Sequence, residues 1–172
     1  MPQHLKQFIR DIPDFPEPGI LFRDIAPLLE NAAAFQSALD HFHVMLKDEA
    51  IDKIVGIESR GFIFGSPLAH RLGVGFAMAR KQGKLPGDKI AVSYDLEYGT
   101  NTIEMHSDSI SADEKILIVD DVLATGGTAN AVISLVNQLG GNVIGLAFLI
   151  ELTFLDGRKT LEGNNIHRLI EY

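Results

Sequence analysis

Short apolar runs alternate with amphipathic patterns along most of this 172-residue chain. Short apolar runs favour buried strands, and apolar residues spaced three and four apart favour helices. The strand-like runs cover residues 54–57, 74–79, 116–119 and 143–150, and the helical patterns cover residues 33–47, 61–72 and 129–139. This alternation predicts an α/β fold, a single domain over residues 1–172 in which helices flank a mainly parallel central sheet.

Two segments interrupt the alternation. Prolines recur from Pro13 to Pro27, so the first 32 residues or so cannot be one regular element, and we expect them to form a cover over the domain. Residues 82–88 contain two glycines and a proline, which indicates a loop. A hairpin around Gly99 is expected to follow, so that residues from about 82 to 106 form one loop and hairpin.

Composition excludes several classes of function. The net charge of −8 argues against non-specific binding of nucleic acid, because the phosphates of nucleic acids repel an acidic protein. No apolar run approaches the roughly 20 residues that span a bilayer, and the N-terminus lacks the apolar core of a signal peptide. The chain has no cysteine, which excludes disulfides and thiolate chemistry. We expect a soluble cytoplasmic protein that binds neither membranes nor nucleic acid.

The strongest functional signal lies in residues 116–128, where a buried strand leads into two carboxylates and then into a turn of small residues. Asp120 and Asp121, when ionised, only accept hydrogen bonds, which suits sugar hydroxyls. Gly126 and Gly127 allow the backbone to approach a ligand closely, and the N–H groups at the start of the next helix form a nest for an anion. The pattern favours a sugar phosphate as the ligand.

A purely structural turn between a strand and a helix would have a similar sequence. From the turn alone, this structural interpretation and the phosphate-binding interpretation are equally good. Two adjacent acids favour the functional interpretation, because their charges repel each other unless something binds them. The rival nucleotide-binding motifs G-x-x-x-x-G-K-[ST] and G-x-G-x-x-G are absent.

Residues 116–128 resemble the ribose-phosphate loop of the type I phosphoribosyltransferases. In that family the two acids hold the ribose 2- and 3-hydroxyls, which implies this role for Asp120 and Asp121. The turn holds the 5-phosphate, and the resemblance assigns that role to Ala124, Thr125, Gly126, Gly127 and Thr128.

Residues 58–61 are similar to the pyrophosphate loop of the same family, which often contains a non-proline cis peptide, here near Glu58-Ser59. Cations after the next strand are then expected to reach the pyrophosphate. The implied pyrophosphate-binding residues are Glu58, Ser59, Arg60, Gly61, Arg80, Lys81 and Lys84. Without the resemblance, residues 59–61 are more simply a helix N-cap, and residues 80–81 are solvent-facing charges.

Residues 19–25 are similar to the adenine-binding strip of the adenine-specific members of this family. There, an aromatic ring stacks on the purine and main-chain groups contact the edge of the base. The resemblance implies stacking by Phe22, with main-chain contacts from Leu21 and Arg23. One carbonyl and one N–H match adenine, whereas a 6-oxopurine would place carbonyl against carbonyl. Taken by itself, Phe22 is more simply a core aromatic residue.

Two further segments extend the resemblance. Residues 83–99 are similar to the flexible catalytic loop of the family, which makes Glu97 the candidate to accept or relay the proton of the base. Taken by itself, Glu97 is a solvated carboxylate beside a turn. Residues 150–158 are similar to the closing segment of the family, which we interpret as structural and not catalytic.

The resemblance implies a pentosyltransferase of purine salvage, which joins adenine to phosphoribosyl pyrophosphate and gives AMP and pyrophosphate. Its catalytic residues would be Glu97, Arg60 and Lys81, with the two cations stabilising the departing charge. The expected cofactor is Mg²⁺, bound mainly through phosphoribosyl pyrophosphate with no direct protein ligand. The family is usually homodimeric. The six histidines do not have the spacing of metal ligands.

Three alternatives stay open. The first is an enzyme that uses a 6-oxopurine, xanthine or orotate as the base. The second is a regulator that binds phosphoribosyl pyrophosphate without turning it over, although such regulators usually carry an added DNA-binding domain, for which we expect no room in 172 residues. The third is a general sugar-phosphate-binding domain.

Overall fold

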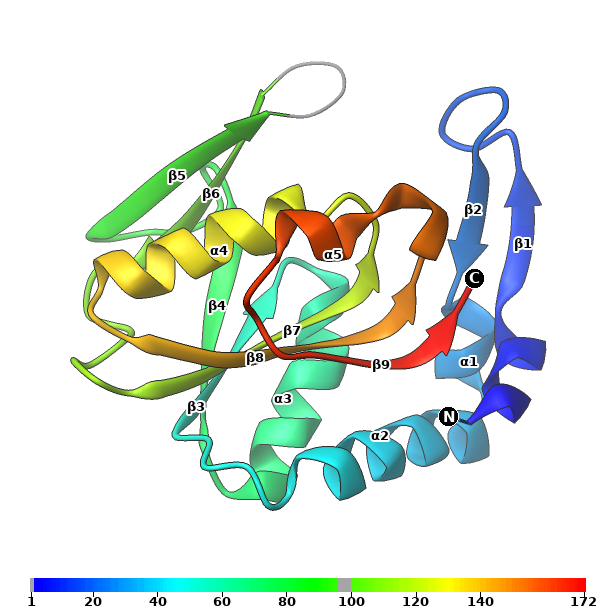
Figure 1. The fold of residues 1–172 in the computed structure, drawn as a ribbon, viewed down its shortest axis with the longest axis horizontal. Coiled ribbons are helices and arrows are strands. Elements are labelled where there is room, and N and C mark those ends of the chain that lie inside the picture. Colours follow the sequence, from blue (N-terminus) through cyan, green and yellow to red (C-terminus); the bar gives the residue numbers. More distant parts are fainter. Residues whose placement is uncertain (1, 96–99) are drawn as a thin grey trace.

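The computed structural model describes residues 2–95 and 100–172, and these form a seven-stranded sheet in the order β5-β6-β4-β3-β7-β8-β9 (Figure 1). The strands are β3 (Lys53–Ile57), β4 (Gly75–Lys81), β5 (Lys89–Asp95), β6 (Thr100–His106), β7 (Lys115–Leu123), β8 (Asn142–Glu151) and β9 (Ile166–Glu171). Strands β4, β3, β7, β8 and β9 run parallel, whereas β6 is antiparallel to both β4 and β5. The predicted α/β fold with a mainly parallel sheet is confirmed.

Two central strands are longer than the apolar runs that predicted them. Strand β7 stays paired with β8 to its end, so Asp120 and Asp121 lie within the last part of β7 and not after it. Strand β4 likewise includes Arg80 and Lys81, because both residues pair with β6. A polar side chain does not end a strand while the main chain keeps a hydrogen-bonding partner.

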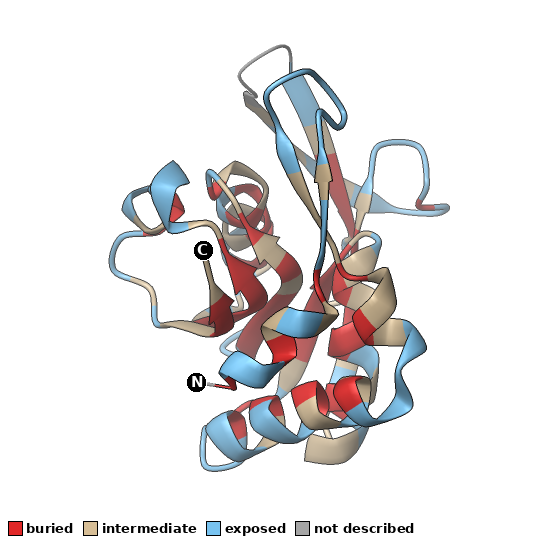
Figure 2. Cartoon of the chain, turned by 90° about the vertical axis from the view of Figure 1, so that its right-hand side faces the viewer, coloured by how far each residue is buried: buried red, intermediate tan, exposed pale blue. Residues whose placement is uncertain are grey.

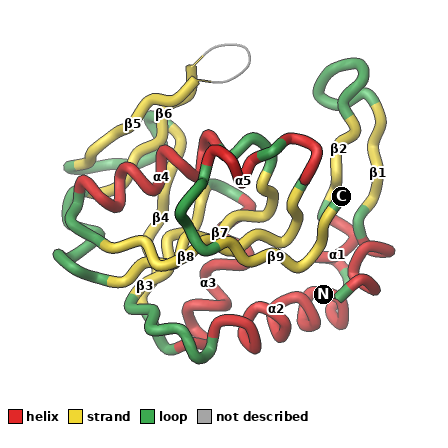
Figure 3. The backbone as a smooth tube through the Cα atoms, in the orientation of Figure 1, coloured by secondary structure: helices red, strands yellow, loops and turns green. Residues whose placement is uncertain are grey.

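Helices cover both faces of the sheet (Figures 1 and 3). The helices and 3-10 turns are η1 (Gln3–Phe8), α1 (Ala26–Glu30), α2 (Ala32–Leu46), α3 (Arg60–Leu72), α4 (Gly127–Gln138), η2 (Thr153–Leu155) and α5 (Gly157–Thr160). Helix α3 packs against β3 and β7 on one face and is covered by α2, whereas α4 packs on the other face. As predicted, α3 ends at Gly73, whose φ of 71° is left-handed. None of the helices in the described ranges is long and apolar enough to cross a membrane.

Apolar side chains fill both spaces between the sheet and its helices. Phe42 of α2 and Phe64 of α3 are fully buried on one side, with ring centroids 6.2 Å apart. Val132 and Leu135 of α4 and Phe148 of β8 are buried on the other side. Figure 2 shows the buried residues concentrated in the sheet and on the inner sides of the helices. This packing fixes the ends of the parallel strands, where the site lies.

The N-terminal segment forms a second, two-stranded antiparallel sheet from β1 (Arg10–Pro13) and β2 (Leu21–Asp24). Next to this hairpin, Leu5, Ile25 and Leu28 are buried in the core beside α2 and α3. The segment is therefore anchored to the main domain. The β1–β2 and β5–β6 hairpins both extend beyond the sheet on the side where β7 and β8 end (Figures 1 and 2).

Candidate active site

The carboxyl ends of β3, β4 and β7 meet at one edge of the sheet, because these strands are parallel neighbours. Two cavities open there, of about 210 and about 320 Å³, and Arg60, Asp120 and Asp121 line both of them. Open α/β sheets bind their ligands at this edge. The shared residues make the two cavities adjoining parts of one candidate site.

The first cavity is mostly polar. Besides the three shared residues, it is lined by Ile57, Glu58, Lys81, Tyr94, Asn101, Ile103 and Thr128. The structure thus brings together the expected ribose acids, three members of the expected pyrophosphate set (Glu58, Arg60 and Lys81) and one residue of the phosphate turn. Glu97, the expected proton acceptor, lies outside the described residues.

The two acids are held by each other and by Arg60. The main-chain N–H of Asp121 donates to Asp120 Oδ1 over 2.8 Å, and Arg60 Nε lies 2.9 Å from Asp121 Oδ2. Burial, and next the charge of Asp121, raise the pKa of Asp120 well above its usual value. Burial also raises the pKa of Asp121, although the guanidinium of Arg60 opposes that shift. A desolvated acid pair of this kind favours hydroxyl or cationic partners.

The turn after β7 leads directly into α4. Gly126 has a left-handed φ of 85°, which favours glycine, and α4 begins at Gly127. The first N–H groups of a helix have no partner within the helix, so this end can receive an anion. A Cβ on Gly126 would lie 2.7 Å from the carbonyl oxygen of Gly157, and Thr160 Oγ1 donates to the carbonyl oxygen of Thr125 over 2.7 Å. Residues of α5 therefore pack against the turn and hold it in place.

The start of α3 adjoins the acids. The Glu58–Ser59 peptide is cis, as the family resemblance implies. Ser59 occupies the N-cap position of α3, as the simpler interpretation of this segment has it, but its side chain makes no capping hydrogen bond. A Cβ on Gly61 would lie 2.5 Å from the carbonyl oxygen of Val119, so only glycine lets α3 begin this close to β7. This approach places Arg60 beside Asp121.

The expected pyrophosphate cations are not equivalent. Glu58 accepts hydrogen bonds from Arg80 Nε at 3.2 Å and from the N–H of Lys81 at 2.9 Å. Burial raises the pKa of Glu58, but these two bonds outweigh it and hold the pKa below its ordinary value. Arg80 Nη1 also donates to the carbonyl oxygen of Lys84 over 2.9 Å. Lys81 lines the cavity, whereas Arg80 and Lys84 are not among its lining residues.

The second cavity has mostly apolar walls from three separate segments. Besides the shared residues, it is lined by Ile20, Leu21, Phe22, Arg23, Val122, Ala124, Leu152 and Leu155. The Phe22 ring lies between Phe15, whose centroid is 5.1 Å away, and the guanidinium carbon of Arg60, which is 5.4 Å from the Phe22 centroid. The expected base-binding strip therefore lies against the expected ribose site.

The side chain of Arg23 is occupied elsewhere. It pairs with Asp11 and lies over the ring of Tyr172, 3.8 Å from its centroid. Among the described residues, strand β2 pairs with β1 alone, so alternate residues of β2 direct their N–H and C=O groups away from β1. This arrangement leaves main-chain groups of the strip as its polar contacts for a ligand.

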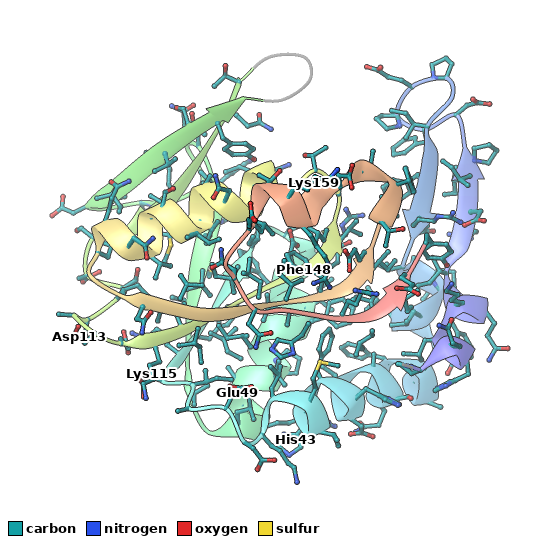
Figure 4. The ribbon with its side chains drawn as sticks, viewed as in Figure 1. His43, Glu49, Asp113, Lys115, Phe148 and Lys159 are labelled. Carbon is teal, nitrogen blue, oxygen red and sulfur yellow. The ribbon has the colours of Figure 1, made fainter. Side chains whose placement is uncertain are left out.

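The segment after β8 supports the apolar cavity. Glu151 is buried, with Arg158 Nε 2.7 Å from its Oε1 and Arg168 Nη1 2.9 Å from its Oε2. These ion pairs link the end of β8 to α5 and to β9. In Figure 4, Lys159 marks α5 above Phe148 of β8. The segment that we predicted to be structural thus also supplies cavity residues.

Sequence reasoning did not assign several of the lining residues, and four of them illustrate the reason. Tyr94 and Asn101 lie opposite each other on the β5–β6 hairpin, and Leu152 and Leu155 follow β8. Tyr94 lies in the segment that resembles the catalytic loop of the family, but the sequence does not tell which side chains of that segment meet the cavity. Leu152 and Leu155 had no signal of their own, because an apolar residue after a strand is usually core.

Comparisons with known proteins agree with this geometry. The phosphoribosyl transferase domain family matches residues 28–164. An adenine phosphoribosyltransferase of Halothermothrix orenii is 56% identical over 97% of this chain and 98% of its own. The crystal structure of the adenine phosphoribosyltransferase of Thermoanaerobacter pseudethanolicus superposes with a TM-score of 0.96 at 50% identity, covering 98% of both chains. The enzyme of Saccharomyces cerevisiae, solved with adenine and an imino-altritol bisphosphate, gives 0.90 at 43% identity, covering 96% of both chains.

Proposed function

The chain belongs to the phosphoribosyltransferase family and, within it, to the adenine phosphoribosyltransferases, and on this premise we propose a role for each part of the site. The protein is a pentosyltransferase of purine salvage that transfers the 5-phosphoribosyl group from phosphoribosyl pyrophosphate to adenine, giving AMP and pyrophosphate. The geometry of the site supports this conclusion through one observation. A polar cavity and an apolar cavity meet at Arg60, Asp120 and Asp121, as a phosphorylated sugar receiving a purine requires.

Ribose is proposed to bind at Asp120 and Asp121, which accept hydrogen bonds from its 2- and 3-hydroxyls. The buried, mutually repelling charges of the pair support this role, because a ligand at that point relieves them. The 5-phosphate is proposed to bind at the turn. The residues proposed to bind it there are Ala124, Thr125, Gly126, Gly127 and Thr128. The left-handed Gly126 and the start of α4 support this assignment, because both expose N–H groups.

The pyrophosphate is proposed to lie between the start of α3 and the end of β4, near Glu58, Ser59, Arg60 and Gly61. Lys81 and Arg60 are the cations that line the first cavity, which supports their proposed catalytic role of stabilising the departing charge. Arg80 and Lys84 are proposed to contact the pyrophosphate as well. Since Arg80 is bound by Glu58, its contribution requires this ion pair to rearrange.

Adenine is proposed to stack on Phe22, with main-chain groups of Leu21 and Arg23 contacting its edge. Two features support this position: Phe22 lines the apolar cavity, and the edge of β2 away from β1 pairs with no other described strand. The C1–O bond to pyrophosphate breaks and its electron pair leaves with the diphosphate. N9 of adenine then bonds to C1 from the opposite face and loses its proton. Glu97 is proposed to accept or relay that proton, on the strength of the family resemblance.

Mg²⁺ is proposed as the cofactor. The described residues contain no group of three or more His, Cys, Asp or Glu side chains that would hold a metal by themselves. The acid pair at the cavity is compatible with Mg²⁺ that is bound mainly through oxygens of phosphoribosyl pyrophosphate and water, with no direct protein ligand. When bound, the ion would neutralise charge on the diphosphate, and Asp120 and Asp121 are the carboxylates in reach of the ribose end.

Residues from about 1 to 32 are proposed to act as a base-binding cover and residues from about 82 to 106 as a catalytic loop, both within one domain of residues 1–172. The protein is proposed to be a cytoplasmic homodimer, as the family usually is. Sedimentation of the purified protein at several concentrations tests the dimer.

The defining experiment is a base panel. The protein is incubated with phosphoribosyl pyrophosphate, Mg²⁺ and adenine, hypoxanthine, guanine, xanthine or orotate, and the nucleotide products are separated by chromatography. We expect AMP from adenine and no product from the other bases. Product from another base instead would overturn the base assignment. Binding of phosphoribosyl pyrophosphate with no product from any base would point to a regulator.

A further inference from the structure

A hydroxyl pair joins the β5–β6 hairpin to the phosphate turn. Thr128 Oγ1, in the first turn of α4, donates to the phenol oxygen of Tyr94 on β5 over 3.0 Å. Both residues line the polar cavity. The two residues are 34 positions apart in the sequence, so this contact depends on the tertiary fold.

The ring of Tyr94 is held in place by packing. It is partly buried against the apolar layer that includes Val132 and Leu135 of α4. Its neighbour Ser93 is exposed on the hairpin, where Ser93 Oγ lies 2.8 Å from Thr102 Oγ1. Successive side chains of a strand point to opposite faces, so the phenol of Tyr94 reaches the cavity and the hydroxyl of Ser93 does not.

The chemistry of the pair limits what Thr128 can do. A threonine hydroxyl has one proton to donate and two lone pairs that accept. In this structure, the proton of Thr128 is directed at Tyr94, so it is not available to an anion at the turn. When a phosphate oxygen takes that proton, the phenol of Tyr94 can reverse its role and donate to Thr128 Oγ1. The two hydroxyls then form a chain that ends on the phosphate, and each bond in such a chain strengthens the next.

We propose that Tyr94 is a positioning residue for the 5-phosphate, acting through Thr128 as a hydroxyl relay. This inference rests on the proposed function, because it requires the 5-phosphate to bind at the turn. Tyr94 does not line the apolar cavity, so the relay acts on the phosphorylated sugar and not on adenine.

The first test replaces Tyr94 by phenylalanine, which keeps the ring and removes the hydroxyl. A neutral hydrogen bond contributes a factor of about two to ten, so Tyr94→Phe raises KM for phosphoribosyl pyrophosphate by about that factor. KM for adenine stays within about twofold. Ribose 5-phosphate binding, measured by calorimetry without adenine, weakens by the same factor. The control Ser134→Ala removes a hydroxyl of α4 that bonds only the carbonyl oxygen of Asn130 among the described residues, and it changes none of these values.

A double-mutant cycle separates a relay from two independent contacts. In a relay, Thr128→Val already removes the group through which Tyr94 acts, so Tyr94→Phe has no further effect on ribose 5-phosphate affinity in that background. Thr128→Ser keeps the hydroxyl and restores the sensitivity to Tyr94→Phe. If the two effects instead multiply, or if Tyr94→Phe binds ribose 5-phosphate like the parent protein, the relay is overturned. Failure of the parent protein to make AMP would overturn the proposed function, while ribose 5-phosphate binding still decides the role of Tyr94.

Discussion

Arg60 contacts both halves of the candidate site: its Nε lies 2.9 Å from Asp121 Oδ2, and its guanidinium carbon lies 5.4 Å from the ring centroid of Phe22. The carboxylate of Asp121 is almost fully buried, whereas Arg60 keeps about two-fifths of its side chain exposed at 41%. The cation is therefore accessible to a ligand while it balances a buried charge. Arg60 lies where the sugar, the leaving group and the base are proposed to meet.

Replacing Arg60 by alanine tests this position. Loss of a preorganised charge at the reacting centre typically costs about 100-fold in kcat, and we expect a loss of that order for Arg60→Ala. Asp121 would also lose its cation, which moves its pKa further upward. Steady-state kinetics with adenine and phosphoribosyl pyrophosphate measure the effect. The control is Arg71→Ala, which breaks the α3 ion pair with the exposed Asp40 and leaves kcat unchanged. A rate for Arg60→Ala within about threefold of the parent contradicts the assigned role.

Phe22 is expected to contribute mainly to adenine binding. Stacking of a base on an aromatic side chain contributes about 1–3 kcal/mol, so Phe22→Ala should raise KM for adenine by tenfold or more. KM for phosphoribosyl pyrophosphate should change by less than about twofold, because Phe22 lines only the apolar cavity. Phe22→Tyr keeps the ring and should retain affinity. Phe154→Ala removes a ring that is 68% exposed and is the matched control. Equal losses for both substrates in Phe22→Ala would argue for a role in the core.

The central elements of the fold were predictable because burial leaves a clear pattern. Residues 116–119 have apolar side chains on both faces, and residues 33–47 repeat apolar residues at helical spacing. The strands β1, β2 and β9 carry charged side chains and lie in a separate hairpin or at an edge, so no such pattern marks them. Pairing with a neighbouring strand defines them, and the pattern of their own side chains does not predict that pairing.

The site was predictable where the residues that bind the ligand are adjacent in the sequence. The acids and the small-residue turn are contiguous, so their order alone indicates a sugar phosphate. Arg80 and Lys81 look equivalent in the sequence, yet Glu58 binds the side chain of Arg80, and Lys81 lines the cavity. Tyr94 joins the site only because the hairpin packs on α4. Such distinctions depend on which strand face meets which partner, and the sequence pattern does not carry that information.

Gly157 should matter for the phosphate turn. A Cβ at this position would lie 2.2 Å from the carbonyl oxygen of Ala124, a main-chain atom that cannot move without moving the turn. Gly157→Ala should therefore weaken ribose 5-phosphate binding at least tenfold and lower the free energy of unfolding by about 1–3 kcal/mol. Calorimetry and urea unfolding measure the two effects. In the control Gly75→Ala, the nearest atom is the flexible Lys53 Cε at 3.2 Å, so both effects should be small.

Thr160 offers a milder test of the same support. Its hydroxyl donates to the carbonyl oxygen of Thr125 over 2.7 Å, and Thr160→Val keeps the shape of the side chain while removing that bond. We expect an increase of about two- to tenfold in KM for phosphoribosyl pyrophosphate and an unchanged KM for adenine. Thr160→Ser should restore the parent value. If Thr160→Val and Thr160→Ser behave alike, the hydrogen bond does not position the turn.

The surroundings of Glu114 lead us to expect a pH dependence of stability that is independent of the active site. Its Oε2 accepts hydrogen bonds from Lys53 Nζ at 2.8 Å and from the N–H of Ser111 at 2.9 Å. Burial raises the pKa of Glu114, but these bonds and the charge of Lys53 together hold the pKa below its ordinary value. The folded state therefore favours the ionised form. This stabilisation is complete above the unfolded pKa and is lost as the pH falls through the lower folded value.

Glu114→Gln removes the charge and should lower the free energy of unfolding by about 1 kcal/mol near pH 7. Urea unfolding of both proteins at a series of pH values should show this difference down to about pH 5 and its progressive loss below about pH 4. Asp108→Asn, at an exposed acid of the preceding turn, is the control and should show a smaller difference at neutral pH. A difference between Glu114→Gln and the parent that does not diminish as the pH is lowered would mean that the glutamine disturbs packing and that the charge of Glu114 does not stabilise the fold.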